Sequence, residues 1–281
     1  MKLLRYGNRG HEQPGVLDSA GQRRSLVGIV PDIDGALLAR LPEALSGIDV
    51  ATLPLVPEDV RSAEPVGKVG KFICIGLNYI DHANEAGMAV PTEPIIFMKA
   101  TSSIIGPDDD VLLPPASVKS DWEVELGVVI GREARYVTRE AAMDHVAGLV
   151  LVNDLSEREY QLERGGQWDK GKGCDTFGPF GPWLVTLDEV DDLGKLDLWL
   201  DLNGKRVQTG NTDKLIFDVA TVVSYVSQFM SLQPGDIIST GTPPGVGMGM
   251  KPPLFLKEGD VMELGITGLG VQRQQVKRWP G

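Results

Sequence analysis

Short apolar runs dominate the chain from residue 71 onward, and most of them are closed by glycine, proline or an Asn-Gly pair. Runs of this length between turn residues are typical of β-strands, so we expect a β-rich body. Asn203 and Gly204 predict a tight hairpin turn between two of the strands. The strand pattern covers residues 71–77, 93–100, 122–131, 147–154, 181–186, 196–208, 236–240 and 260–267.

Helical periodicity is confined to three stretches, which are residues 139–146, 156–164 and 218–230. Ser156 and Glu159 have the spacing of a capping box, in which a serine side chain and a glutamate side chain satisfy each other's backbone N–H groups. This motif predicts that Ser156 begins the second helix.

The first part of the chain differs from the strand-rich remainder. It carries a strand pattern at residues 2–6 and an amphipathic stretch at 36–45. Residues 56–71 mix proline, glycine and charge without a period, as linkers do. We therefore expect a small N-terminal domain with its linker at residues 1–65 and a larger domain at 66–281.

Composition and charge narrow the class of partner. The 281 residues are 42% hydrophobic and 23% charged, which is typical of a folded globular protein. The formal net charge of −12 repels phosphate backbones and anionic membranes, so a small anion can bind only where a local cation or metal reverses the field. The first ten residues lack a signal-peptide core, no apolar run is long enough for a bilayer span, and the two cysteines suggest neither a disulfide nor a zinc site. We expect a cytoplasmic protein without nucleic-acid or membrane partners.

Three carboxylates form the most informative pattern. Side chains alternate along a strand, so Glu123 and Glu125 project from the same face of segment 122–131. Such a pair can be an ordinary solvated face, or it can be compensated by a cation. Asp154 ends another apolar strand, where it can merely favour a helix start or can join the glutamates. If the strands are neighbours, the three hard oxygen ligands select Mg²⁺, Mn²⁺ or Ca²⁺ over zinc.

Further groups could complete a site around these carboxylates. Arg158 and Gln161 are three residues apart, so they share one helical face, which could equally be an exposed surface. Lys172 lies in a glycine-broken stretch that is either a mobile basic loop or a means of placing an ammonium group in a cleft. His82 and Glu85 can touch on one helical turn, and a carboxylate that orients an imidazole makes it a better general base, although His-x-x-Glu is common by chance.

The glycine-rich run at residues 240–251 does not fit a nucleotide-binding motif. Met250 stands where a dinucleotide fingerprint beginning at Gly245 requires its third glycine, and no Gly-Lys-Ser/Thr follows. We interpret the run as a corner whose backbone amides, with the Thr242 hydroxyl, hold a carboxylate. The chain has no Gly-x-Ser-x-Gly elbow, so an acyl-serine mechanism has no nucleophile.

Taken together, these segments resemble the fumarylacetoacetate hydrolase family. The resemblance implies an α+β fold, with a mixed β-sandwich roll and a small N-terminal domain, commonly as a homodimer. It implies a metal, usually Mg²⁺, on Glu123, Glu125 and Asp154, and a water-activating dyad of His82 and Glu85. The segments that carry it are GLNYIDH, PIIFMKATSSIIGP, DWEVELGVVIG, VNDLSERE, KGKGCDTFGPFGPW, PGDIISTGTPPGVG and GDVMELGITGLG. The substrate contacts that it implies are Tyr79, Arg158, Gln161, Lys172 and Thr242.

One departure separates this chain from the long animal members of that family. They have a fourth acidic ligand just before the tyrosine, where this chain has Leu77 and Asn78. The chain is thus similar to the shorter, three-carboxylate branch, which includes bacterial ureidoglycolate lyases and hydrolases of 2,4-diketo-3-deoxy sugar acids.

The resulting functional hypothesis is metal-dependent hydrolytic C–C cleavage of a small anionic 2,4-dioxo acid through a metal-bound enolate, with release of pyruvate. His82, oriented by Glu85, would activate water, and Lys172 with Gln161 or Arg158 would stabilise the oxyanion or reprotonate carbon. Alternatives on the same metal site are ureidoglycolate cleavage to glyoxylate and urea, oxaloacetate decarboxylation and dioate isomerisation. A metal-stabilised binding protein without catalysis is the alternative of another class.

Overall fold

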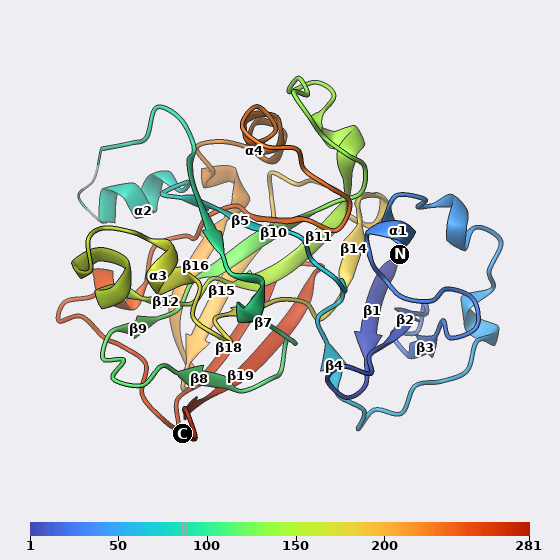
Figure 1. The fold of residues 1–281 in the computed structure, drawn as a ribbon, viewed down its shortest axis with the longest axis horizontal. Coiled ribbons are helices and arrows are strands. Elements are labelled where there is room, and N and C mark those ends of the chain that lie inside the picture. Colours follow the sequence, from blue (N-terminus) through green and yellow to red (C-terminus); the bar gives the residue numbers. More distant parts are fainter. Residues whose placement is uncertain (86, 88) are drawn as a thin grey trace.

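A computed structural model describes residues 1–85, 87 and 89–281, and most of its regular secondary structure is strand (Figure 1). The strands are β1 (Lys2–Tyr6), β2 (Gln13–Leu17), β3 (Arg23–Ser25), β4 (Ser62–Ala63), β5 (Phe72–Gly76), β6 (Ile95–Lys99), β7 (Ile104–Ile105), β8 (Val111–Leu113), β9 (Ser120–Asp121), β10 (Val124–Ile130), β11 (Val146–Asn153), β12 (Ser156–Glu157), β13 (Gly178–Pro179), β14 (Leu184–Thr186), β15 (Asp197–Leu202), β16 (Lys205–Asn211), β17 (Ile237–Ser239), β18 (Val261–Ile266) and β19 (Gly270–Arg278).

The helices are short. The α-helices are α1 (Gly35–Leu38), α2 (Ile80–Glu85), α3 (Asp169–Lys172) and α4 (Val219–Val226). Short 3-10 helices lie at Glu43–Leu45, Val50–Thr52, Thr101–Ser103, Ala142–His145, Leu187–Glu189, Thr212–Lys214 and Gly247–Gly249, and a π-helical turn lies at Glu159–Glu163. In the part of the chain that the structure describes, no helix is long and apolar enough to cross a membrane.

A large mixed sheet forms the centre of the molecule. Its strand order is β3-β2-β1-β14-β11-β10-β17-β5-β6, with β4 paired to β1. The β10 strand runs antiparallel to both β11 and β17, while β17 and β5 are parallel. Each predicted strand segment overlaps an observed strand, and Asn203 and Gly204 form the predicted hairpin turn between β15 and β16, both with positive φ.

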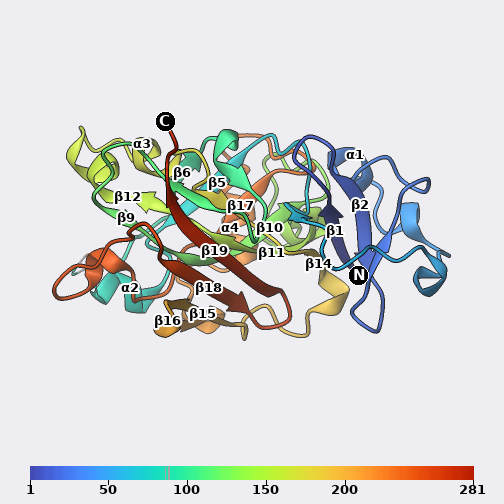
Figure 2. The ribbon, with the colours of Figure 1, turned by 90° about the horizontal axis from the view of Figure 1, so that it is seen from below.

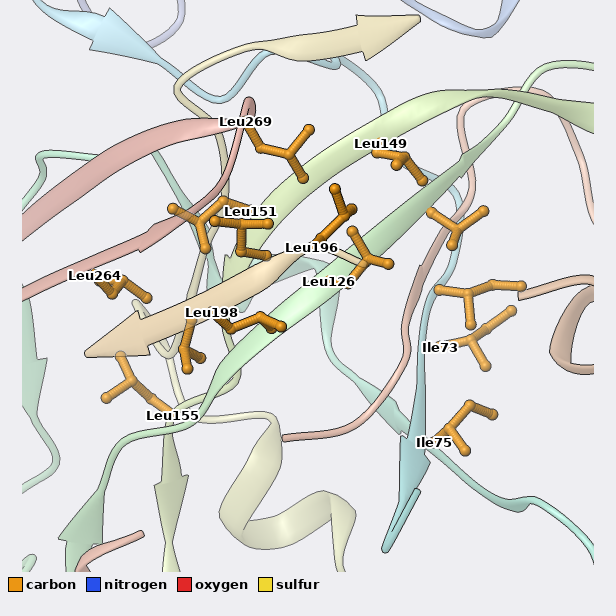
Figure 3. Close-up of a cluster of buried hydrophobic side chains, with 14 of the residues drawn as sticks. Ile73, Ile75, Leu126, Leu149, Leu151, Leu155, Leu196, Leu198, Leu264 and Leu269 are labelled. Carbon is orange, nitrogen blue, oxygen red and sulfur yellow. The ribbon is translucent and has the colours of Figure 1, made fainter. Parts of the chain in front are cut away.

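A second sheet, in the order β16-β15-β18-β19-β8, packs on one face of the large sheet (Figure 2). Side chains alternate along β10 and β11, so Leu126 and Leu151 point toward this second sheet. There they join Leu198 and Leu264 in a buried apolar cluster (Figure 3). The arrangement is the predicted mixed β-sandwich.

The N-terminal segment extends the large sheet at one end, and its apolar side chains join a second buried cluster on the opposite face (Figure 2). Val150 and Val152, which alternate with the leucines of β11, pack in a buried cluster with Leu3 and Val16 of the first strands. The β1 strand also pairs with β14, so it continues the large sheet (Figure 1). Within residues 56–71, β4 pairs with β1, so the segment predicted as a linker includes a strand of this sheet. Both faces of β10 and β11 are thus covered, which explains their nearly unbroken apolar sequences.

The prediction that Ser156 begins a helix is wrong. Ser156 lies in β12 and pairs with Asp121 of β9, and its hydroxyl donates to the carbonyl oxygen of Asp154 at 3.2 Å. The backbone N–H of Glu159 donates to the Glu157 carboxylate at 3.1 Å, and the N-cap of the turn that follows is Arg158, not Ser156. Helical periodicity at 139–146 corresponds only to a 3-10 turn, whereas α4 lies within 218–230 as predicted.

The packing between the two sheets predicts a large effect of Leu151→Ala on stability. Leu151 is fully buried in the cluster between the sheets, so truncation leaves a cavity that rigid strands cannot close. We expect the free energy of unfolding to fall by about 2–5 kcal/mol. Urea unfolding followed by circular dichroism would measure it, with Leu254→Ala as the control because Leu254 is 39% exposed. Equal midpoints for the two variants would contradict the assignment of this core.

Candidate metal centre and active-site cavity

Glu123, Glu125 and Asp154 meet at the end of the central strands. In the β10–β11 pair, Val124 is opposite Asn153, so Asp154 follows directly beside the two glutamates. One carboxylate oxygen from each of the three residues lies within 4.8 Å of the others, and all three side chains are buried. The strands are therefore neighbours, as the metal hypothesis required, and the set consists of hard oxygen ligands.

Two buried lysines compensate part of this negative charge. Lys172 Nζ lies 2.6 Å from Glu123 Oε2 and 2.7 Å from Asp154 Oδ2. Lys99 Nζ lies 2.5 Å from Asp154 Oδ1 and donates also to the carbonyl oxygen of Leu155. Burial alone would raise the pKa of Glu123, but Lys172 and Arg158 lower it well below its ordinary value. Burial alone would lower the pKa of Lys172, but Asp154 and Glu123 raise it, so Lys172 is a cation at neutral pH.

Glu125 is the carboxylate of this set whose charge is least compensated. Its Oε2 accepts from the Ser239 hydroxyl at 2.6 Å and from the Gly241 N–H at 2.9 Å. Among the residues described, no lysine or arginine forms an ion pair with it. Burial, followed by repulsion from Asp154 and Glu123, raises its pKa well above the ordinary value. A divalent cation would relieve this repulsion, so the donor set fits the metal that the sequence implies.

Arg158 and Gln161 are brought together at the same site. Arg158 donates from Nε to Asp121 at 2.8 Å, from one terminal nitrogen to Glu123 at 2.7 Å, and from the other to the Gln161 side-chain oxygen at 3.0 Å. An arginine has five N–H groups, so one on each terminal nitrogen is left to bind a ligand. The helix predicted here is instead a π-helical turn that follows Arg158.

His82 and Glu85 lie on α2, one turn apart. His82 Nδ1 is 3.4 Å from Glu85 Oε2, and the His82 side chain is buried. The Glu85 carboxylate is itself held by the backbone N–H of Gly245, at 3.1 and 3.2 Å from its two oxygens. The imidazole therefore has a carboxylate neighbour on one nitrogen, and the other nitrogen is available for a proton transfer.

These groups surround a cavity of about 130 Å³. Its wall combines the charged groups with apolar side chains. Among the predicted site residues, those that line it are His82, Glu123, Glu125, Arg158, Gln161, Lys172 and Thr242. The other lining residues are Ile75, Gly76, Leu77, Phe97, Leu162, Trp168 and Met248. Asp154 lies behind Lys172, and Glu85 lies behind His82.

Two hydroxyls that the resemblance assigns to substrate binding have other surroundings. Thr242 lines the cavity, but its hydroxyl donates to the carbonyl oxygen of Val124 and accepts from Gln208, both at 2.9 Å. Tyr79 is fully buried outside the set of lining residues, and its hydroxyl has no hydrogen-bond partner within the described part of the chain. Neither hydroxyl points a free donor at the cavity in this structure.

The backbone amides of the glycine-rich run hold carboxylates, as its sequence suggested, but these carboxylates belong to the protein. The N–H of Gly241 donates to Glu125, that of Gly245 to Glu85, and that of Gly247 to Asp121. Residues 240–251 therefore hold Glu125, Glu85 and Asp121 in place by backbone hydrogen bonds. Three residues of the site were missed in the sequence, namely Lys99, Asp121 and Ser239.

Comparisons with known proteins identify the family of this chain. The family model described as fumarylacetoacetate (FAA) hydrolase C-terminal matches residues 71–277. A Burkholderia orbicola protein is 61% identical to this chain over 279 residues, which cover 99% of each of the two chains. Its name describes it provisionally as a hydrolase.

Solved structures of similar proteins cover the whole fold. A fumarylacetoacetate hydrolase from Exiguobacterium antarcticum has a TM-score of 0.90 at 36% identity, covering 99% of this chain and all of that one. A 2-hydroxyhepta-2,4-diene-1,7-dioate isomerase from Mycobacterium marinum has a TM-score of 0.80 at 30% identity, with complete coverage of both chains. This chain is therefore an enzyme that belongs to the fumarylacetoacetate hydrolase family.

Proposed function

We propose that this enzyme hydrolyses a C–C bond of a small 2,4-dioxo acid and releases pyruvate. The observation that carries the proposal is the meeting, around one cavity, of three hard ligands with a His–Glu pair and a buried ammonium group. Hydrolysis of this kind needs a cation for the acid end of the substrate, a base for water and a positive group for the developing oxyanion. Each of these needs has a candidate at the cavity.

The metal of this proposal is Mg²⁺, with Mn²⁺ or Ca²⁺ as alternatives, held by Glu123, Glu125 and Asp154. When bound there, it would supply a Lewis acid that stabilises negative charge on the oxygens at the carboxyl end of the substrate. The remaining N–H groups of Arg158 and the side-chain amide of Gln161 would hold the same end by hydrogen bonds, because both line the cavity.

His82 would take the proton from the attacking water, and Glu85 would hold the imidazole in the orientation that this transfer needs. The water oxygen forms a bond to C4 of the substrate, and the C3–C4 bond then breaks. Its electron pair remains on C3 as the enolate of pyruvate, which takes the proton held by His82 and becomes pyruvate, while C4 leaves as a carboxylic acid. Atoms and charge balance with one water consumed.

Lys172 is better suited to stabilising the oxyanion than to donating a proton. Asp154 and Glu123 raise its pKa, and an ammonium group with a raised pKa gives up its proton reluctantly. Its Nζ also lies 5.1 Å from the centroid of the Phe97 ring, and both side chains line the cavity. We therefore assign Lys172 to electrostatic stabilisation of the oxygen on C4.

The rest of the cavity wall favours an uncharged acyl group. Phe97, Trp168 and Met248 contribute apolar surface. Of the two cations that line the cavity, Arg158 is assigned to the carboxyl end of the substrate, and Lys172, which is bonded to Glu123 and Asp154, is assigned to the oxygen on C4. A second substrate carboxylate at this end would therefore be desolvated without a free lysine or arginine among the described lining residues.

This reasoning predicts the order of substrates. An acylpyruvate with an apolar acyl group should have a kcat/KM about 10- to 100-fold above that of an analogue ending in a second carboxylate, because an unpaired buried charge costs about 1–3 kcal/mol or more. Purified protein with MgCl₂ would be assayed by coupled detection of pyruvate. The panel would include a 2,4-diketo-3-deoxy sugar acid, oxaloacetate, a hepta-2,4-diene-1,7-dioate and ureidoglycolate. Urea and glyoxylate as the main products would overturn the proposal in favour of a lyase, and absence of any turnover would favour a binding protein.

A further inference from the structure

Asp121 is a buried carboxylate to which neither the metal site nor the proposed proton transfer gives a role. It lies in β9, two residues before Glu123, and is fully buried. Its Oδ1 accepts from the backbone N–H of Trp122 at 2.8 Å and of Gly247 at 2.7 Å. Its Oδ2 accepts from the N–H of Met248 at 3.0 Å and from Arg158 Nε at 2.8 Å. One carboxylate therefore joins a substrate-binding guanidinium to a glycine-rich loop.

That loop, residues 245–249, is itself closely packed. A Cβ at Gly245 would lie 2.0 Å from the Val207 carbonyl oxygen, and one at Gly247 would lie 1.9 Å from the Leu254 carbonyl oxygen. Only glycine can occupy these two positions without moving backbone. The loop thus brings its amides to Asp121 by close backbone contact, and it is a rigid support for the carboxylate.

The same loop also reaches the two other sides of the cavity. Gly245 N–H holds the carboxylate of Glu85, which faces His82, and Met248 forms part of the cavity wall. Trp122 Nε1 donates to the carbonyl oxygen of Gly245 at 3.2 Å, so the residue next to Asp121 fixes the other end of the loop. The guanidinium of Arg158 and the His–Glu dyad consequently share one support.

We propose that Asp121 is a positioning residue, which locks Arg158 against loop 245–249 so that its free N–H groups face the substrate. The inference rests on the proposed function only for the identity of the substrate. Without Asp121, the Nε–H of Arg158 would be buried without an acceptor, and the side chain would rotate toward Glu123 and the cavity. The charge of Arg158 would remain, but the N–H groups of its planar guanidinium would no longer be aligned with a substrate carboxylate.

Asp121→Asn tests this inference. The amide oxygen of asparagine can still accept from Gly247, but its NH₂ group cannot accept from Arg158 or Met248. We expect KM for the preferred 2,4-dioxo acid to rise about 10- to 100-fold while kcat changes less than about threefold. This result means that the lost interaction stabilises the bound substrate and the transition state equally. Calorimetric titration should give a similar affinity for Mg²⁺ in the variant and the wild type.

A double-mutant cycle separates positioning from a general structural role. If Asp121 acts through Arg158, then Asp121→Asn should change KM less than about threefold in an Arg158→Gln background. Asp109→Asn is the matched control, because Asp109 likewise accepts from an arginine, Arg61 Nε at 2.7 Å, and from a glycine N–H, Gly106 at 2.8 Å, outside the cavity. This control should leave KM unchanged.

A crystal structure of the Asp121→Asn variant provides a readout that is independent of turnover. We expect the Arg158 guanidinium to be displaced, with Glu123 and Glu125 unmoved. An unmoved guanidinium, an additive double mutant, or an equal rise of KM in Asp109→Asn would each overturn the inference. If wild-type protein releases no pyruvate from any 2,4-dioxo acid, the proposed function fails and the crystal structure alone decides the role of Asp121. Should Asp121→Asn not fold, Asp121→Ser serves as the second variant.

Discussion

Replacing His82 by alanine is expected to lower kcat by about 10²- to 10⁴-fold, the usual contribution of a general base. His82 is the described imidazole that lines the cavity, and Glu85 lies 3.4 Å from its Nδ1. The loss should appear in kcat more than in KM, because His82 would act on water and not on the substrate. Steady-state kinetics with pyruvate detection would measure both constants.

His11→Ala is the matched control for this prediction, because His11 is an exposed histidine in the N-terminal segment. It should leave kcat unchanged, and the affinity of the His82→Ala variant for Mg²⁺ should remain close to that of the wild type. Glu85→Gln should give a smaller loss, since an amide can still orient the imidazole but does not stabilise its charged form. Full activity of His82→Ala would remove this residue from the mechanism.

Much of the fold could be predicted because its strands are buried on both faces. The apolar runs of β10 and β11 remain recognisable without tertiary information, and the turn residues between strands mark their ends. Glu123 and Glu125 could be predicted for the same reason, since two carboxylates within an apolar strand are unusual. What the periodicity could not supply was the strand order that brings Asp154 beside them.

The helix at Ser156 shows where local motifs fail. The capping-box spacing is present, but Ser156 pairs with Asp121 in a two-residue ladder, and Glu157 accepts from the backbone of Lys119 at 3.1 Å and of Glu159. Tertiary pairing at a distance of 35 residues thus overrides a motif that spans four. The same β9–β12 pairing positions Arg158. The contact that makes the helix prediction at Ser156 wrong is therefore also the contact that builds this part of the site.

Lys99 and Asp121 were missed although the sequence contains a signal for each. Asp121 continues the alternation of Glu123 and Glu125 and therefore belongs to the same face by period. Lys99 ends an otherwise apolar strand, where a buried charge needs a partner. The partner of Lys99 is Asp154, 55 residues away, and no local pattern could identify it.

Removal of the metal, or of one of its ligands, is expected to have the largest effect on activity. Chelation with EDTA should reduce turnover by about 10³-fold or more, because Lewis-acid stabilisation contributes several kcal/mol to such reactions. Glu125→Gln should weaken Mg²⁺ binding by at least about 100-fold, beyond the 10- to 100-fold typical of residues that only orient ligands. Calorimetric titration measures the affinity, and Glu263→Gln is the control, since Glu263 is an exposed glutamate in β18.

In the metal-free protein, Glu125→Gln should increase the free energy of unfolding. The pKa of Glu125 is raised in the folded state by burial and by Asp154 and Glu123, so the ionised form destabilises the fold. As pH rises above about 4.3, where an unfolded glutamate ionises, wild-type protein in EDTA should lose stability relative to Glu125→Gln. With Mg²⁺ present, the wild type should instead be the more stable protein. The ion binds its folded state tightly, whereas the Glu125→Gln variant lacks one of the three carboxylates that would hold the ion. Thermal unfolding with EDTA or MgCl₂ between pH 4 and 8 measures this difference in stability. If the variant were less stable than the wild type in EDTA at every pH, the charge of Glu125 would not be uncompensated, and the argument for a metal at this position would fail.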